Sequence, residues 1–401
     1  LNVDQHTLNN CTLKLDLDYS HASKGNFDFL ALQPFYFNLK GSFSKGSVVG
    51  EVTLLDYPLQ VENLSSKLSY RGSLHIKDGK FSTEGDGRLL DLTYKDISLG
   101  PASYRLKLDG DSYSLDLKGE AFSLSGGGSL EEKSFSGRLS FMGMDLSYKD
   151  LLVKSLNGHM DIRADKNSLK LVGNLSTFLS RDRLSSHVLL SLDMTKKGEE
   201  VFGSFEGGLK DVRAFDLVYE KGSFSGKVQK ERVYFSFDLD QRLRGGGQYS
   251  LKEGSYSLTG SVKDTIMGLF VDGGYSIRGV KEDLEASFGG EGRYRDFSFP
   301  IKASLSLRGN RLKASLEGFT TKDGLISIRS GGAEVYGDKD GGILEIKPIG
   351  LFIGQDLLSK LEFEKGTYRG KSLSIKGKIS GVVEGNVGVS YHNTLSLTSA
   401  G

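Results

Sequence analysis

Residues 94–119 decide the fold, because a set of short motifs in this stretch returns with its spacing intact. The stretch contains YKDISL at 94–99, LKLDG at 106–110 and LDLKG at 115–119. A shift of 54 positions gives YKDLLV at 148–153, MDIRA at 160–164 and LKLVG at 169–173. A third copy reads YRDFSFP at 294–300, LSLRG at 305–309 and LKASLEG at 312–318. Each copy has apolar residues at every second position between glycines, so the repeats predict one long sheet of short strands.

Alternation of apolar and polar residues continues outward from these copies in both directions. Near the start of the chain, Leu13, Leu15 and Leu17 are interleaved with Lys14 and Asp16. A period of two places one set of side chains on each face of a sheet, which favours antiparallel strands with one apolar and one wet face. The fold class we predict is therefore all-β, a long curled antiparallel sheet. Its apolar face must be covered by closure into a barrel, by a filled core, or by a ligand in a trough.

The composition excludes several classes of protein. The 401 residues include 53 Gly and only 5 Pro, and 52 basic residues are balanced by 51 acidic ones. This balance gives no basic surface for nucleic acid, so we expect no nucleic-acid partner. Cys11 is the single cysteine, which rules out a disulfide within the chain. The abrupt first and last residues suggest a fragment of a longer protein, and residues 1–401 are expected to form one elongated region.

No pattern in the sequence points to catalysis or to a bound cofactor. The six histidines lack the spacing of a zinc site, and no Gly-x-Ser-x-Gly nucleophile motif occurs. The glycine runs at 126–128 and 245–247 lack the Lys-Ser/Thr of a phosphate-binding loop. The acidic turn at 338–341 lacks the later glutamate of a calcium loop. We therefore predict a protein that is not an enzyme and has no metal or cofactor.

Several local features give further expectations. Dipeptides ending in glycine are expected to form the turns between strands: Asp78-Gly79, Lys221-Gly222 and Asp272-Gly273 are examples. Residues 355–361 could form a turn or two of helix, and residues 175–184 a loop or short helix. The Tyr-Lys/Arg-Asp motif could be a binding signature. Its more economical interpretation is structural, with the tyrosine at a strand end covering the rim of the apolar face.

The repeated motifs resemble the bacterial AsmA-like family. The resemblance rests on residues 94–99, 148–151 and 294–297, which are similar to that family's tyrosine-basic-acidic-apolar signature, and on the apolar-x-apolar-x-Gly strands that follow them. It implies a β-taco, a long curled sheet around an apolar groove, in the periplasm of a Gram-negative bacterium. It also implies a parent protein anchored in the inner membrane that moves phospholipid and docks on an outer-membrane barrel of the TamA or BamA type. The family's N-terminal anchor and C-terminal domain are not recognisable in this chain.

The resulting hypothesis is a lipid conduit whose groove contacts phospholipid acyl chains. The residues expected to line it alternate along the strands: Leu13, Leu15, Leu17, Leu106, Leu108, Leu115, Leu117, Phe235, Phe237, Leu305, Leu307, Leu316, Leu373 and Ile375. A structural β-solenoid or adhesin-like protein with a filled core is the main alternative. An outer-membrane β-barrel is a third. Against the barrel stand the absence of Trp, the lack of an aromatic girdle, and strands that look shorter than the roughly 9 to 11 residues needed to cross a bilayer.

Overall fold

The computed structural model shows an all-β protein. It describes residues 2–3, 6–7, 11–17, 24–95, 97–148, 150–214, 217–266, 268–321, 325–338, 340–369, 372–382, 384–392 and 395–400. No helix occurs among these residues, which confirms the predicted fold class. The chain comprises two compact units, unit 1 (Leu1–Val218) and unit 2 (Tyr219–Gly401). The expectation that residues 1–401 form one undivided region stays a prediction.

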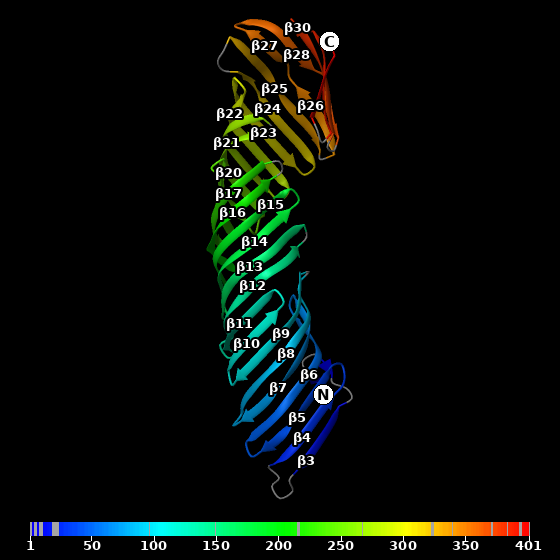
Figure 1. The fold of residues 1–401 in the computed structure, drawn as a ribbon, viewed down its shortest axis with the longest axis vertical. Helices are drawn as coiled ribbons and strands as arrows, with labels where there is room; N and C mark the ends of the chain where they lie inside the picture. The colour runs from blue at the N-terminus through cyan, green and yellow to red at the C-terminus, as the bar shows by residue number, and fades with distance from the viewer. Residues whose placement is uncertain are drawn as a thin grey trace. The chain divides into compact units, whose positions relative to one another are not determined.

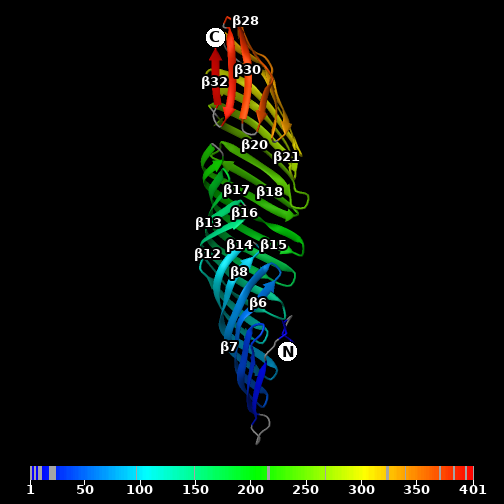
Figure 2. The ribbon, with the colours of Figure 1, turned by 90° about the vertical axis from the view of Figure 1, so that its right-hand side faces the viewer.

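Strand bounds in unit 1 are β1 (Asn2–Val3), β2 (His6–Thr7), β3 (Thr12–Leu17), β4 (Gly25–Ala31), β5 (Tyr36–Ser44), β6 (Ser47–Val61), β7 (Leu64–Lys77), β8 (Lys80–Tyr94), β9 (Ile97–Asp109), β10 (Ser112–Gly119), β11 (Phe122–Ser129), β12 (Ser134–Tyr148), β13 (Leu151–Ala164), β14 (Ser168–Arg181), β15 (Leu184–Lys197) and β16 (Glu200–Ala214). From β3 to β16, each strand pairs antiparallel with the next strand of the chain. Figures 1 and 2 show this order within the unit, for example for β6, β7 and β8.

Strand bounds in unit 2 begin with β17 (Leu217–Lys230), whose first two residues belong to unit 1, and continue with β18 (Arg232–Leu239), β19 (Leu243–Ser250), β20 (Ser255–Ile266), β21 (Leu269–Val280), β22 (Asp283–Tyr294), β23 (Phe297–Arg308), β24 (Arg311–Thr320), β25 (Ile326–Asp338), β26 (Gly341–Ile346), β27 (Ile349–Ile353), β28 (Asp356–Phe363), β29 (Gly366–Arg369), β30 (Ser372–Gly381), β31 (Gly385–His392) and β32 (Leu395–Ala400). Both β26 and β27 pair with β25, and both β28 and β29 pair with β30. β26 and β27 therefore act together as one interrupted long strand, and so do β28 and β29. The antiparallel meander continues through both.

The tyrosine motifs form two-residue hairpin turns. Tyr94 pairs with Ile97, and Tyr294 pairs with Phe297, which places Lys95 in the first turn and Arg295 and Asp296 in the second. Lys95 has φ 53° and Arg295 has φ 52°, the positive φ that tight hairpins require at the first turn position. The same pairing joins Tyr148 to Leu151. The predicted position of the tyrosine, at the end of a strand, is confirmed.

Three local predictions are wrong. Residues 355–361, predicted as a short helix, lie mostly in β28, where Leu357 pairs with Phe352 of β27. Backbone pairing with β27 outweighs the weak helical pattern of this stretch. Residues 175–184 belong to β14, its hairpin turn and the start of β15. Lys221-Gly222 and Asp272-Gly273 lie inside β17 and β21 and are not turns. Gly273 pairs with Gly290, where the two backbones approach closely, whereas Asp78-Gly79 does form the β7–β8 turn.

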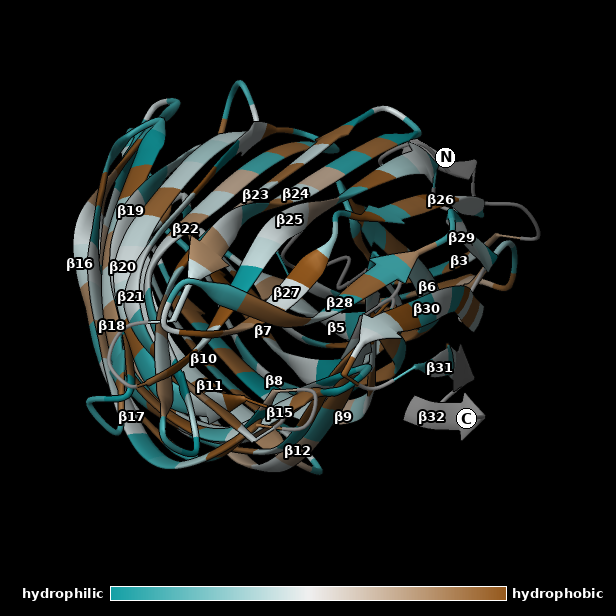
Figure 3. Cartoon of the chain, turned by 90° about the horizontal axis from the view of Figure 1, so that it is seen from above, coloured by the Kyte–Doolittle hydropathy of each residue, from teal (hydrophilic) through white to brown (hydrophobic). Residues whose placement is uncertain are grey.

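Many strands are longer than the sequence suggested. β6, β8, β12 and β16 each have 15 residues, because each strand continues through a β-bulge that breaks the alternation. The strand-length argument against the barrel alternative is therefore wrong. Along the strands, apolar and polar residues alternate as bands of brown and teal (Figure 3).

Candidate functional site: an apolar groove

The floor of the site in unit 1 consists of residues paired across successive strands. Leu106 of β9 pairs with Leu115 of β10, which pairs with Gly126 of β11. Residues directly opposite each other in an antiparallel ladder share one face, so each chain of pairs is a row on that face. The row through Leu106 contains Leu13, Phe29, Leu39, Val52, Gly72, Gly85, Leu106, Leu115, Gly126, Gly137, Ile162, Leu171, Met194 and Gly203. Every member is apolar or glycine.

Neighbouring rows on the same face have the same character. The row through Leu117 contains Ala31, Phe37, Leu54, Tyr70, Gly87, Tyr104, Leu117, Leu124, Leu139, Met160, Gly173, Leu192 and Phe205. The row through Leu108 contains Leu15, Phe27, Gly41, Gly50, Leu74, Thr83, Leu108, Tyr113, Gly128, Phe135, Ala164, Leu169, Lys196 and Val201. Thr83 and the exposed Lys196 are its polar members. Together these rows form an apolar surface several residues wide that crosses strand after strand.

Glycines in these rows let aromatic rings lie against the sheet. A Cβ on Gly126 would lie 2.5 Å from the Ser136 carbonyl oxygen and 2.8 Å from the Phe135 ring. No side chain larger than hydrogen fits there, and the ring of Phe135 covers the backbone instead. The aromatic rings can therefore lie flat against the backbone of the floor.

β-Bulges aim a second set of side chains at the same space. Asp91 has φ 53° and Gly143 has φ 68°, and each lies where the strand register shifts by a residue. The extra residue exchanges the two faces of the strand beyond it. Leu90 is 38% exposed, yet Leu92 is only 3% exposed. Likewise Met142 is 76% exposed and Met144 is 5% exposed.

Side chains hold the backbone of these bulges. The Asn157 side chain accepts a hydrogen bond from the Gly143 amide at 2.9 Å, and the Asp145 carboxylate accepts one from the Ser155 amide at 2.7 Å. Ser155 is itself in the left-handed region, with φ 52°, and precedes the buried Leu156. Leu92, Met144 and Leu156 thus all directly follow a residue with positive φ.

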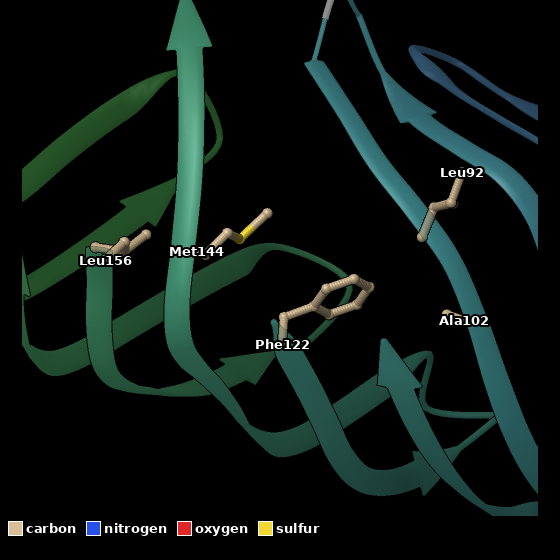
Figure 4. Packing of buried hydrophobic residues seen from close by; sticks show 5 residues of the cluster. All are labelled: Leu92, Ala102, Phe122, Met144 and Leu156. Atoms are coloured by element: carbon tan, nitrogen blue, oxygen red, sulfur yellow. The ribbon is translucent and has the colours of Figure 1, made fainter. Parts of the chain in front are cut away.

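Those residues form the wall of the groove. Leu92, Ala102, Phe122, Met144 and Leu156 are buried against one another, with the β8 and β9 side chains opposite those of β11, β12 and β13 (Figure 4). The groove between wall and floor has a volume of about 770 Å³. Floor residues include Tyr104, Leu106, Leu115, Leu117 and Leu124, and wall residues include Leu59, Leu64, Leu92, Ile97, Leu99, Met144 and Leu146.

The tyrosine hydroxyls on the floor form hydrogen bonds within the protein. The Tyr104 hydroxyl donates to the Ser69 carbonyl at 3.1 Å, and the Tyr70 hydroxyl lies 2.7 Å from the Thr83 hydroxyl. Burial, with a smaller contribution from Tyr70, raises the pKa of Tyr104, so the phenol stays neutral. A ligand lying on this floor would meet rings, methyl groups and satisfied hydroxyls, and no charge.

Charges lie on the opposite face. Arg138 of β12 binds Asp161 of β13 at 2.7 Å, and Arg105 of β9 binds Asp86 of β8 at 2.9 Å. The hydrogen bond from Arg138 lowers the pKa of Asp161. These exposed cross-strand pairs keep the outer face wet while the inner face is apolar.

Unit 2 repeats this arrangement with smaller side chains. A groove of about 470 Å³ lies over residues that include Tyr275, Phe288, Leu305, Leu316 and Val335. The row through Phe235 and Leu305 contains Gly226, Phe235, Gly247, Leu258, Ile277, Ala286, Leu305, Ala314, Val335, Leu344 and Gly366. The row through Phe237 contains Phe224, Phe237, Gly245, Gly260, Tyr275, Phe288, Ala303, Leu316, Ala333 and Ile346.

An ion pair with a buried carboxylate and a partly exposed guanidinium lies on this apolar face. The Asp264 carboxylate follows Val262 on the same face of β20 and accepts hydrogen bonds from Arg242 and from the Thr265 amide. The Arg242 guanidinium lies 5.0 Å from the centre of the Tyr219 ring. Burial, and then the nearby Asp264 charge, raise the pKa of Tyr219. The cluster therefore places polar groups just inside the Ile266–Leu269 pair, in a row that continues through the apolar Val271.

The residues predicted for unit 1 share one face. Leu106, Leu115 and Leu117 line the groove directly, and Leu108 lies in the adjacent row. Leu13 and Leu15 lie on the same face in β3, where they are 64% and 55% exposed. The side chain of Leu17 lies outside the described residues.

The residues predicted for unit 2 also share one face. Leu305 and Leu316 line its groove. Phe235 and Phe237 lie in the rows given above, and a third row contains Val233, Tyr249, Tyr256, Gly279, Leu284, Leu307, Leu312, Gly337, Gly342, Tyr368 and Leu373. Ile375 packs against Gly366 and is 3% exposed, so it supports the face without being available to a ligand.

Sequence reasoning missed the wall. Its signal was present as two adjacent apolar residues followed by Asp or Gly and a further apolar residue. This pattern occurs as Leu54-Leu55-Asp56-Tyr57, Leu89-Leu90-Asp91-Leu92 and Phe141-Met142-Gly143-Met144. In each case the third residue has positive φ and the fourth turns inward.

Comparisons with known proteins do not identify a relative. No family model matches the chain, and no curated protein is similar to it. Within the ranges that the structure describes, no helix is long and apolar enough to cross a membrane. The same ranges hold no group of three or more His, Cys, Asp or Glu side chains arranged to bind a metal ion.

Proposed function

We propose that this chain is part of a non-enzymatic conduit that carries phospholipid between the inner and outer membranes, as its resemblance to AsmA-like proteins, and to TamB most closely, implies. The observation that carries the proposal is the series of apolar rows. In each unit they cross strand after strand on one face and border an unfilled groove. A uniform apolar track suits a ligand that slides, because no position on it binds much more tightly than the next.

The energetics favour acyl chains as the occupant. Each methylene removed from water contributes about 0.8 kcal/mol, so a chain that leaves a bilayer needs continuous apolar contact along its length. The Leu106, Leu115 and Leu117 side chains offer this contact and are neither fully buried nor charged. Periplasmic location, an inner-membrane anchor and an outer-membrane barrel partner of the TamA or BamA type are parts of the same proposal.

The partial burial of the floor leucines favours the conduit over a filled core. A solenoid with a dry interior would bury most of its inward leucines. Here the larger cluster of fully buried apolar residues is the wall, whereas the floor leucines Leu106, Leu115 and Leu117 are only partly buried.

Mass spectrometry of organic extracts from protein purified without detergent tests the proposal. Copurified phospholipid in amounts comparable to the protein is the expected result. A soluble protein free of lipid would support the filled-core alternative and overturn the conduit. A protein that stays in solution only with detergent would point to the membrane barrel.

A further inference from the structure

The two rims of each unit differ in chemistry. On one rim the hairpins are closed mostly by apolar pairs, such as Val61–Leu64 and Tyr94–Ile97 in unit 1 and Ile266–Leu269 and Tyr294–Phe297 in unit 2. Arg181–Leu184 is an exception on this rim. On the other rim the closing pairs are polar, such as Lys77–Lys80, Asp109–Ser112 and Arg308–Arg311. We name these the apolar rim and the polar rim. The apolar rim continues the groove of unit 1 outward, since Tyr94 and Ile97 both line it.

A basic side chain lies over each exposed tyrosine on the apolar rim. The Lys95 ammonium lies 5.8 Å from the centre of the Tyr94 ring, and the Arg295 guanidinium lies 5.6 Å from the centre of the Tyr294 ring. Both tyrosines are about half-exposed. The Lys95 amide donates to the Asn63 carbonyl at 2.8 Å, which holds its turn against the neighbouring hairpin. Neither cation forms an ion pair with a carboxylate in the part of the chain that the structure describes.

We propose that the Tyr94–Lys95 turn, and its counterpart Tyr294–Arg295, bind the phosphate headgroup of a lipid whose acyl chains lie on the apolar face. This inference rests on the proposed lipid-carrying function and adds a specific site to it. A lipid in the groove must place its headgroup where apolar surface meets water. At that boundary Tyr94 presents an apolar ring edge, and Lys95 presents a positive charge complementary to phosphate.

The repeat explains why the site occurs more than once. Unit 1 and unit 2 each present a tyrosine followed by a basic turn residue at the end of the apolar face. Each unit therefore offers a headgroup the same pair of groups, an aromatic ring edge and a cation, beside its own apolar face. The apolar floor alone cannot distinguish a phospholipid from a diacylglycerol with the same chains, so preference for phosphate must come from the rim.

The experiment compares two lipids with identical acyl chains. Full-length chain is equilibrated with a mixture of phosphatidylethanolamine and diacylglycerol, and the ratio of the two bound lipids is measured by mass spectrometry. The test variant is Lys95→Gln with Arg295→Gln. The matched control is Lys133→Gln with Lys281→Gln, because Lys133 (φ 51°) and Lys281 (φ 55°) are turn lysines on the polar rims with the same backbone conformation.

We expect the test variant to lower the phospholipid-to-diacylglycerol ratio roughly threefold to fivefold, the effect of losing an exposed charge contact. Diacylglycerol binding, the control variant and Lys95→Arg should match the wild type, and inorganic phosphate at millimolar concentration should not displace the lipid. Equal ratios in test and control variants would overturn the headgroup site while leaving the conduit intact. A wild type that binds neither lipid would overturn the conduit, and the site with it.

Discussion

A single carboxylate on the floor of the groove should abolish lipid binding without unfolding the protein. Leu115 is the best position, because it lies in the central row between Leu106 and Gly126 and lines the groove of unit 1. Its neighbour Ser114 projects from the opposite face, where it is exposed and pairs with Lys107. Leu115→Asp and Ser114→Asp therefore add the same charge to the two faces of one strand.

The expected size of the effect follows from the groove. Removing the Leu115 side chain loses up to about 1.5 kcal/mol of apolar contact with an acyl chain, half the value for full burial. Desolvating the new carboxylate beneath that chain costs several kcal/mol more. Even a net 2 kcal/mol weakens binding about 30-fold. Because Leu115 is partly buried in the protein, we expect the free energy of unfolding to fall by about 1 to 3 kcal/mol.

The measurement is titration of each variant with a fluorescent acyl-chain probe, with thermal unfolding in parallel. Leu115→Asp should lose binding, whereas Ser114→Asp should bind like the wild type. Leu115→Met keeps the volume and the apolar character, so it should also bind normally. Equal binding by the two aspartate variants, with both folded, would refute the assignment of the apolar face as the lipid track.

Three further predictions concern the fold. Gly290→Ala should lower the free energy of unfolding by about 1 to 3 kcal/mol, since its Cβ would lie 2.3 Å from the Asp272 carbonyl oxygen. The adjacent Gly289→Ala is the control, because its Cβ would have no atom within 4 Å and the change should be neutral. Urea denaturation of the two variants measures the difference. Hydrogen bonds from Arg308 and Arg278 lower the pKa of Glu285, so the stability it contributes is present above its unfolded pKa and is lost as pH falls through the folded pKa. Glu285→Gln should then differ from wild type in urea midpoint near neutral pH but not in strong acid. Small-angle scattering tests whether residues 1–401 form one elongated region, and a radius of gyration near the roughly 21 Å of a compact globule would contradict that.

The floor could be predicted from the sequence because period-two alternation survives in the folded ladder. Leu106, Leu108, Leu115 and Leu117 lie on one face, as their spacing requires once β9 and β10 pair without a register shift. Register is imposed by the wet and apolar faces themselves, since a slip of one residue would bury Lys107 and expose its neighbours. Alternation therefore carries both the strand assignment and the identity of the inner face.

Turn chemistry was less informative, because glycine serves two purposes in this chain. At Asp78-Gly79 it supplies the positive φ of a hairpin turn. At Asp272-Gly273 the same dipeptide lies mid-strand, where Gly273 pairs with Gly290 and lies against the Phe288 ring. A local sequence cannot distinguish these cases, since the second depends on which residue the neighbouring strand places opposite.

The wall and the floor of the groove differ in role: wall residues stabilise the fold, and floor residues are available to a ligand. Leu92 and Met144 are buried because the preceding residue takes positive φ and exchanges the faces of the strand. Their packing depends on the backbone of the bulge, so the wall forms with the groove empty. Floor residues such as Leu115 keep part of their surface open, and an occupant would complete their contacts. Substitutions in the wall should therefore act mainly on stability, and substitutions in the floor mainly on binding.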